Sequence, residues 1–316
     1  MKSKKIFFAG LFVLVLAGCS STSVRLPVTH PAEINLKGFA KIAIGEITGR
    51  GSADLSEELT QALFESGRFE VLNRQNLDRI LAEHSLALSG VIDEEQAAEL
   101  GKFLGAAALI FGRVSEHGYK EELTHADYTD KKTGKKTRTY TRSGRARVSA
   151  TLQVVDLTTG KILAIKKFTK VQTARTSADG ERPVKIDPKP LLAKCRSGII
   201  RDFMKKIAPY TEYVSVSFET DKSMPELERG YNMAKVGSWD RAIQLFTQAA
   251  KRNRSNPAVH KAWYNLGMAY LYTDRFDRAR KALLKAYEIK PEGKYERALK
   301  QVEVRRDEQR RLQEQL

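Results

Sequence analysis

The chain has 316 residues, of which 41% are hydrophobic, and a formal net charge of +17 at pH 7. This apolar content suffices for a packed core of two domains and excludes a wholly disordered chain. The two cysteines leave no pair for an internal disulfide, because one of them lies in an expected lipid-attachment motif. The charge indicates an anionic neighbour, such as lipid headgroups, lipopolysaccharide, cell-wall polymer or nucleic acid, or else simply a solvated surface.

Residues 1–18 resemble the signal peptide of a bacterial lipoprotein. Three lysines precede an apolar run at 6–16, which is too short to span a bilayer as a mature helix. The run leads into Leu-Ala-Gly-Cys, which resembles a lipobox, so we expect cleavage before Cys19 and lipidation of its thiol. An ordinary secretory signal with an unmodified cysteine is the alternative. Ser20 follows the cysteine and resembles the outer-membrane sorting pattern. Several acyl chains would anchor the protein firmly, at about 0.8 kcal/mol per buried methylene.

The next segments predict a tether followed by an α/β scaffold. Residues 19–35 are polar, contain two prolines and show no hydrophobic period, so we expect an acylated tether. The apolar run 41–47 predicts a strand, and the leucines of 52–67 predict a helix. Between 69 and 116, two further apolar runs bracket two helical patterns. This order predicts a strand–helix–helix–strand unit without a catalytic constellation.

Residues 117–144 and 173–189 are polar, interrupt the apolar pattern and are expected to form loops. The first segment is expected to form a projecting hairpin or a mobile loop around a Thr-Gly turn. Between the two segments, 145–156 alternates apolar and polar residues and 161–171 returns, which predicts an antiparallel hairpin. The basic residues of the first segment that are expected to contact an anionic surface are Lys131, Lys132, Lys135, Lys136 and Arg138.

An amphipathic pattern at 191–207 predicts a helix with Cys195 on its apolar face. We interpret Cys195 as a small buried hydrophobe rather than a reactive thiol. The alternating residues 213–218 predict a strand that closes the first domain.

Residues 224–293 contain two similar blocks, in which 239–242 aligns with 276–279 at an offset of 37. The second block has the spacing W…LG…Y…A…A…P and resembles a tetratricopeptide repeat. Such repeats pair two helices, and we expect a groove that binds a partner protein. A charged helix at 294–316 is expected to cap the stack, because two repeats are fewer than the usual three. The residues expected to line the groove are Tyr231, Asn232, Lys235, Tyr264, Asn265 and Met268.

Three stretches resemble the CsgG-like family of curli-secretion lipoproteins: EVLNRQNLDRILAE, AELGKFLGAAALIFGRVS and VVDLTTGKIL. The resemblance implies an α+β fold at 36–220, a periplasmic domain with a mixed sheet and packed helices, followed by the all-α helical-hairpin module. In channel members of this family, segments near the two polar segments span the membrane. The resemblance therefore implies a subunit of an oligomeric outer-membrane secretion channel as one function. Neither polar segment here has an uncharged face that suits lipid, which favours a different function.

Motifs for catalysis and metal binding are missing from the sequence. None of the five histidines pairs with another histidine, a cysteine or a carboxylate at a ligand spacing. His117 and His125 flank the start of the first polar segment and are candidate metal ligands, although solvated histidines are the simpler interpretation. Phosphate-loop, dinucleotide and nucleophile-elbow patterns do not occur. We therefore expect no enzyme activity and no cofactor.

These patterns favour an outer-membrane-anchored periplasmic lipoprotein that acts as a non-enzymatic scaffold or assembly factor in envelope biogenesis or secretion. We expect it to hold the membrane by its lipid anchor and a protein partner by its repeats, as a monomer or a homo-oligomer. The basic hairpin is expected to contact lipopolysaccharide or cell-wall polymer. Its lysines and tyrosines also suit nucleic acid, but a protein sorted outside the cytoplasm would not meet that partner.

Overall fold

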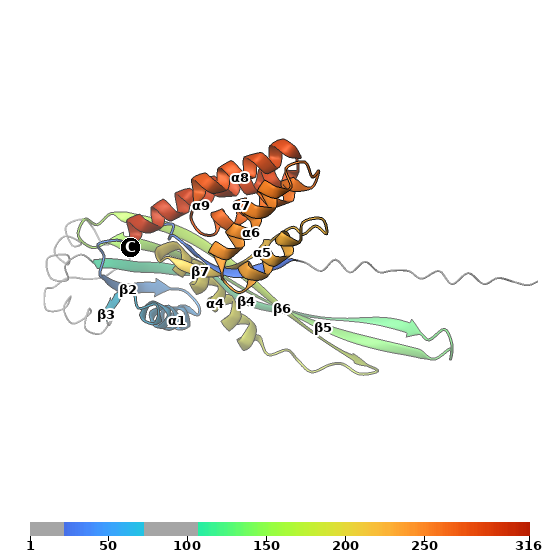
Figure 1. Cartoon of the computed structure of the whole chain (residues 1–316). Helices are drawn as coiled ribbons and strands as arrows, with labels where there is room; N and C mark the ends of the chain where they lie inside the picture. Colours follow the sequence, from blue (N-terminus) through green and yellow to red (C-terminus); the bar gives the residue numbers. More distant parts are fainter. Residues whose placement is uncertain (1–21, 73–106) are drawn as a thin grey trace, which may run out of the picture. The chain divides into compact units, whose positions relative to one another are not determined.

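The computed structural model describes residues 22–72 and 107–316, which form two compact units (Figure 1). The signal peptide, Cys19 and the two helices expected after Leu72 lie outside the described residues. We call the two units the sheet unit and the repeat unit. Their described residues are 29–72, 107–211 and 308–316 for the sheet unit, and 22–28 and 212–307 for the repeat unit.

The sheet unit is built on a five-stranded mixed sheet in the order β3-β2-β4-β5-β6. Strand β2 pairs in parallel with β3 and β4, whereas β4, β5 and β6 form an antiparallel meander. The apolar runs that predict strands in this part of the chain all form them. The strand bounds are β2 Lys41–Thr48, β3 Glu70–Leu72, β4 Ala107–Thr129, β5 Lys136–Asp156 and β6 Ile162–Asp179.

Helices α1 (Ser52–Glu65) and α4 (Pro188–Ile207) share one hydrophobic core with this sheet. The predicted leucine period of α1 places Leu55, Leu59 and Leu63 entirely inside. The inward residues of the alternating strand β5 meet the apolar face of α4, as both patterns predict. The core residues of β5 and α4 include Val148, Ala150, Leu152, Val154, Cys195, Ile199 and Phe203.

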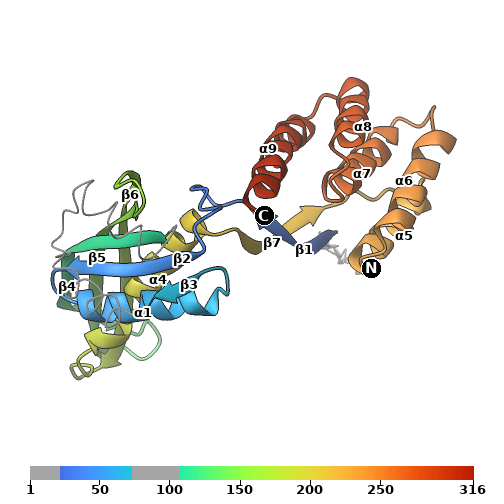
Figure 2. The ribbon, with the colours of Figure 1, turned by 90° about the vertical axis from the view of Figure 1, so that its left-hand side faces the viewer.

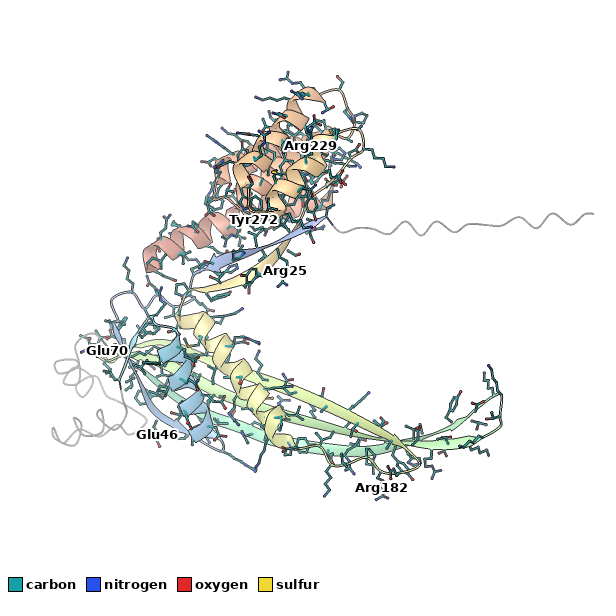
Figure 3. All side chains as sticks on the ribbon, turned by 60° about the horizontal axis from the view of Figure 1, so that its bottom comes forward. Arg25, Glu46, Glu70, Arg182, Arg229 and Tyr272 are labelled. Carbon is teal, nitrogen blue, oxygen red and sulfur yellow. The ribbon has the colours of Figure 1, made fainter. Side chains whose placement is uncertain are left out.

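Strands β4, β5 and β6 continue past the helices as a three-stranded extension (Figure 3), which we call the arm (residues 119–145 and 173–179). The ladder between β4 and β5 reaches the last pair, Thr129 with Lys136. The first polar segment is therefore a projecting hairpin, the first of the two expected forms. The second polar segment differs from the expected loop, because 173–179 belongs to β6. Backbone hydrogen bonds build the ladder without any need for apolar side chains.

The repeat unit contains two helical hairpins and a further helix, as the aligned blocks predict (Figure 2). Helices α7 and α8 approach closely because Gly267 lacks a side chain: a Cβ there would lie 2.5 Å from Leu283 Cγ. No helix within residues 22–72 and 107–316 is long and apolar enough to cross a membrane. The helix bounds are α5 Pro225–Lys235, α6 Trp239–Arg252, α7 Val259–Leu271, α8 Phe276–Ile289 and α9 Gly293–Gln315.

Strands β1 (Ser23–His30) and β7 (Tyr210–Ser217) form a separate two-stranded sheet. The expected tether at 19–35 is therefore wrong for 23–30, and β7 does not close the five-stranded sheet. The physical reason is the alternation of β1, in which every second side chain is apolar and buried. Side chains of both strands, and the phenylalanine that follows β7, lie in the core of the repeat unit. They are Val24, Leu26 and Val28 of β1, Val216 of β7, and Phe218.

The end of α9 also differs from the expected cap at 294–316, because residues 308–316 belong to the sheet unit. Within that unit, the buried Gln315 amide bonds both backbone groups of Ala32. Gln315 Oε1 accepts from Ala32 N at 2.7 Å, and Gln315 Nε2 donates to Ala32 O at 2.9 Å. Gln315 thus provides Ala32 with one hydrogen-bond acceptor and one donor, as the backbone of a neighbouring strand would.

Candidate functional site

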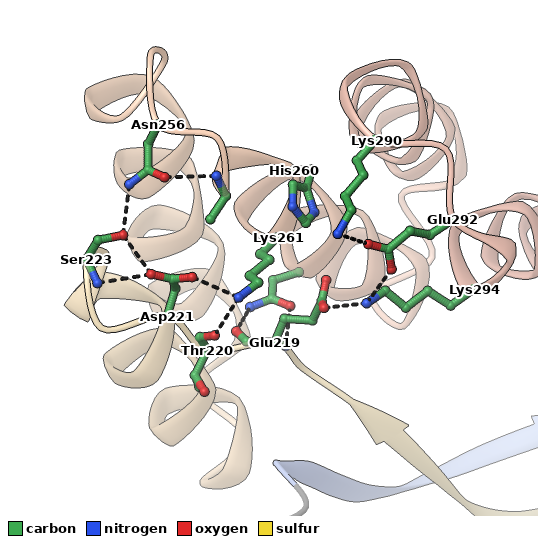
Figure 4. A network of polar contacts seen from close by, with 12 residues as sticks. Glu219, Thr220, Asp221, Ser223, Asn256, His260, Lys261, Lys290, Glu292 and Lys294 are labelled. Carbon is green, nitrogen blue, oxygen red and sulfur yellow. Dashed lines mark hydrogen bonds and ion pairs between the residues drawn. The ribbon is translucent and has the colours of Figure 1, made fainter.

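A polar cluster in the repeat unit surrounds Phe218–Ser223, the connecting segment that links β7 with α5 (Figure 4). Helix α7 holds the backbone of this segment. Glu219 N donates to Asn265 Oδ1 at 2.8 Å, and Asn265 Nδ2 donates to Glu219 O at 2.7 Å. Asn265 is completely buried. Because the two bonds involve only main-chain groups of Glu219, Asn265 binds the backbone at this position independently of the side chain that it carries.

The carboxylate of Glu219 is held by the start of α9. Lys294 Nζ donates to one oxygen at 2.5 Å, and the Tyr295 hydroxyl donates to the other at 2.7 Å. His260 Nδ1 lies 2.7 Å from the same hydroxyl and donates to it, since the hydroxyl proton is directed at Glu219. Burial, and then the hydrogen bond to Glu219, raise the pKa of Tyr295, which keeps this donor protonated. Although burial opposes it, hydrogen bonds to Glu219 and Glu292 raise the pKa of Lys294.

A second carboxylate of the segment, Asp221, is bound by α7 as well. Lys261 Nζ donates to it at 2.8 Å, and the Ser223 hydroxyl donates at 2.6 Å. The Lys261 hydrogen bond, followed by those from Ser223, lowers the pKa of Asp221 to about 2. Asn256 Nδ2 in turn donates to Ser223 Oγ at 2.8 Å. Asp221 is therefore an ionised acceptor at any pH at which the protein is expected to work.

The connecting segment also has an apolar anchor. Phe218 is 2% exposed and stacks on Phe246, with 5.6 Å between ring centroids and 16° between ring planes. The rings of Tyr231 and Trp239 each lie 6.4 Å from that of Phe218. The segment is thus held by aromatic packing, by its backbone and by two carboxylates.

The groove residues predicted on α7 are not open to a partner in this structure. Tyr264, Asn265 and Met268 are 7%, 0% and 5% exposed. Asn265 is occupied by the connecting segment, and the Tyr264 ring lies 5.0 Å from that of Tyr295 in α9. The chain itself therefore covers Asn265 and Tyr264 in this structure, and their role in binding a partner stays a prediction.

The groove residues predicted on α5 have different surroundings. Tyr231 is half-buried beside Phe218, whereas Asn232 and Lys235 are exposed. Sequence reasoning missed Lys261 and the start of α9 as the groups that bind carboxylates. One signal in the sequence could have found them. Lys261 and Asn265 are four residues apart in α7, so they lie on the same side of a helix that is otherwise mostly apolar.

The tip of the arm is a tight, well-bonded turn. Asp130 Oδ1 accepts from the backbone N–H groups of Lys132 at 2.7 Å and of Thr133 at 3.0 Å. Gly134 takes a φ of 69°, which an L side chain rarely adopts, and its N–H donates to Asp130 O at 2.8 Å. These bonds keep the predicted basic residues together at the end of the arm. All five residues of this set are exposed, and we call the four lysines among them, Lys131, Lys132, Lys135 and Lys136, the tip lysines.

Arg138 differs from the tip lysines, although all five were predicted as one anion-binding set. Its guanidinium donates two hydrogen bonds to Asp127, at 2.6 and 2.8 Å. Asp127 raises the pKa of Arg138, and Arg138 lowers that of Asp127. A carboxylate therefore already neutralises this cation. No ion pair between a tip lysine and an acidic side chain is found in the described part of the chain.

The base of the arm is tied to the chain that leaves β6. Glu121 accepts from Arg142 Nη1 at 2.5 Å, from the Tyr119 hydroxyl at 2.8 Å and from Ile186 N at 3.1 Å. Burial and the bond to Glu121 raise the pKa of Tyr119 to about 12. Arg142 Nε also donates to Pro183 O at 3.0 Å. The direction of the arm is therefore set by specific bonds at its root.

The two histidines considered as metal ligands do not converge. His117 lies against Gly51, and burial, followed by Arg196, lowers its pKa. His125 lies on the arm, where its ring is 5.8 Å from that of Tyr140. Among residues 22–72 and 107–316, no group of three or more His, Cys, Asp or Glu residues is arranged to hold a metal ion.

Two family models match the chain in succession. Residues 36–186 match the curli production assembly/transport component CsgG, and residues 227–294 match a tetratricopeptide repeat. No curated protein matches the chain.

Three solved structures are similar over part of the chain. Lipoprotein GNA1162 from Neisseria meningitidis is 15% identical with a TM-score of 0.28, over 52% of this chain and 97% of that one. The PelC dodecamer from Paraburkholderia phytofirmans is 14% identical with a TM-score of 0.28, over 59% and 98%. The LpoB C-terminal domain from Escherichia coli is 14% identical with a TM-score of 0.27, over 42% and 84%. The family matches thus place a CsgG domain at residues 36–186 and tetratricopeptide repeats at residues 227–294, in that order.

Proposed function

We propose that the protein is an envelope lipoprotein, anchored through Cys19 to the outer membrane and facing the periplasm, that acts as a scaffold in envelope assembly or secretion. The CsgG domain and the repeats support an envelope location and a protein-interaction role, and neither family is catalytic in general. The observation that carries the scaffold proposal is the arm, which presents the tip lysines on a bonded turn beyond the core.

The tip lysines suit a surface that carries phosphate groups, such as phospholipid headgroups or lipopolysaccharide. A lysine near an anionic membrane surface contributes about 1 kcal/mol, so the four together contribute about 4 kcal/mol, or roughly a thousandfold in affinity. Exposed charges are screened over about 8 Å at physiological ionic strength, so this contact weakens as salt rises. Arg138 contributes little, because Asp127 neutralises it.

The test is cosedimentation of the purified full chain with vesicles that contain anionic phospholipid, with lipopolysaccharide, and with zwitterionic vesicles. Replacing the four tip lysines by glutamine should abolish binding to the anionic surfaces. The matched control replaces four exposed lysines of the repeat unit, Lys222, Lys235, Lys251 and Lys281, by glutamine and should bind as the unchanged protein does. Equal loss in both variants, or binding that is insensitive to salt, would refute a contact made by the arm.

Lipidation is tested separately by mass spectrometry of the protein extracted from membranes. The proposal expects an acylated N-terminal peptide that begins at Cys19 and that disappears in the variant Cys19→Ser. An unmodified cysteine, or a different cleavage site, would contradict the anchor.

A subunit of an oligomeric secretion channel is the second candidate. The match to the CsgG family motivates it, since the matched residues include all three strands of the arm. The arm opposes it, because charged side chains such as Lys120, Glu122 and Arg145 on one face and Glu121 and Asp127 on the other leave no apolar face. Light scattering and negative-stain imaging of the lipidated protein decide between the two. A ring of many subunits with a central hole would establish the channel, and a monomer or small oligomer would exclude it.

A further inference from the structure

We propose that α7 and the start of α9 form a binding site for an extended segment of the pattern aromatic–acidic–any–acidic, and that the connecting segment occupies this site as an internal ligand. A protein partner that carries the same pattern would bind by replacing it. This inference rests on the proposed partner-binding role of the repeats and names the chemistry of the partner.

Asn265 binds the backbone of the connecting segment. Asn265 is completely buried, yet both polar groups of its amide are directed at Glu219, one as acceptor and one as donor. If the buried Asn265 amide bonded only to residues of neighbouring helices, its role would be to stabilise helix packing. Here its two bonds require the backbone N–H and C=O of one residue in front of α7, and any residue other than proline supplies the same two groups.

The two carboxylates of the connecting segment are each matched by a cation of the site. Glu219 and Asp221 lie two residues apart, and each meets a lysine ammonium: Lys294 for the first and Lys261 for the second. The residue between them, Thr220, is exposed, which leaves that position unspecified.

An aromatic residue, Phe218, precedes the first carboxylate and is enclosed by other rings. Phe218 fills a space bordered by the rings of Phe246, Tyr231 and Trp239. These rings come from α5 and α6, so both helices of the first repeat contribute to the same site. An aromatic residue, a backbone pair and two carboxylates together specify three of four successive positions of a ligand, those of Phe218, Glu219 and Asp221.

Continuity with β7 and α5 explains why this site is closed in the isolated chain. A segment tethered at both ends competes at an effective concentration of the order of millimolar or more, so a free peptide of the same sequence cannot displace it at micromolar concentration. Weakening the internal ligand without changing the site should therefore open the site to a peptide in trans.

The experiment uses the full chain and a fluorescent peptide with the sequence of residues 218–223, Phe-Glu-Thr-Asp-Lys-Ser, followed by fluorescence anisotropy. The opened variant, Glu219→Gln with Asp221→Asn, keeps the size of both side chains and removes their charges from the internal ligand. It should bind the peptide at least tenfold more tightly than the unchanged protein. Adding Lys261→Gln and Lys294→Gln to the opened variant should abolish that gain. A control peptide with glutamine and asparagine at the two acidic positions should bind neither protein.

The result that would overturn the inference is an opened variant that is folded but binds the acidic peptide no better than the unchanged protein. Folding is checked by tryptophan fluorescence, since Trp239 and Trp263 both lie in the repeat unit. If the double variant does not fold, the single variant Asp221→Asn is used in the same peptide assay. A folded single variant that binds the acidic peptide no better than the unchanged protein would also overturn the inference. The peptide assay involves neither vesicles nor the tip lysines. Failure here therefore leaves the proposed surface contact standing, and failure of vesicle binding leaves this site standing.

Discussion

The Asn265 amide offers the sharpest test of how the repeat unit is held together. The variant Asn265→Ala removes both hydrogen bonds to the backbone of Glu219 and adds no new group. A buried polar group left without a partner costs about 1–3 kcal/mol, and this variant leaves two. Glu219 is only partly buried, so water reaches some of the exposed backbone. We therefore expect a loss near the lower limit, about 2 kcal/mol in the free energy of unfolding of the repeat unit.

Asn232→Ala is the matched control, because it makes the same substitution inside a helix at an exposed position. Alanine is the better helix former by up to about 0.7 kcal/mol, and this gain is common to both variants. The difference in stability between the two variants therefore isolates the contact with Glu219.

The assay is urea unfolding followed by tryptophan fluorescence, which reports on the repeat unit since that unit contains both tryptophans. With a slope of about 2 kcal/mol per molar urea, the midpoint of Asn265→Ala should fall about 1 M below that of Asn232→Ala. Midpoints that agree within experimental error would show that the amide does not hold the connecting segment.

Three further predictions concern packing, pH and thiol chemistry. Gly267→Ala should destabilise the repeat unit by about 1–3 kcal/mol in the same urea assay, because the new Cβ would lie 2.5 Å from Leu283 Cγ. Gly293→Ala, whose nearest neighbour is a flexible arginine end at 3.5 Å, should be neutral or stabilising, and equal effects would refute the packing argument. The folded-state pKa of Asp221 is lowered from 3.8 to about 2, so the stability that it contributes is present above pH 3.8 and is lost as pH falls from there towards 2. Acid titrations of Asp221→Asn should lack this component, and superimposable curves would count against the Lys261 contact. Cys195 is fully buried and burial raises the pKa of its thiol, so a disulfide reagent should modify it only after urea unfolds the sheet unit. Rapid reaction in the native protein would contradict this burial.

Local periodicity was sufficient to predict the parts of the fold that depend on neighbouring residues. The leucines of α1 repeat at helical spacing and are all buried, and the alternation of β5 gives one buried face. The aligned blocks at 239–242 and 276–279 begin two equivalent helices, α6 and α8. In each case the signal is an apolar period that matches the geometry of the element, so it can be read without knowledge of what covers it.

Charge composition predicted the surface of the arm less completely. The tip lysines are exposed as expected, but Arg138 is paired with Asp127, a residue that precedes it by 11 positions. The pair follows from the register of the β4–β5 hairpin, in which these two residues are direct cross-strand neighbours. Once the hairpin is predicted, such a pair is accessible to sequence reasoning, whereas the strand character of 173–179 is not, because its side chains are polar.

Only the tertiary structure decided the site in the repeat unit. The amphipathic pattern that marks α7 as a repeat helix is compatible with an open groove or a filled one. The presence of Asn265 in the sequence does not distinguish the two cases. The structure fills it with Glu219, which is 46 positions away, and pairs β1 with β7 across nearly two hundred residues. The sequence by itself determined which elements form, because a helix or strand needs only its own apolar period. The packing of one segment on another depends on contacts between residues that are far apart in the sequence. The local sequence pattern contains no signal for these contacts.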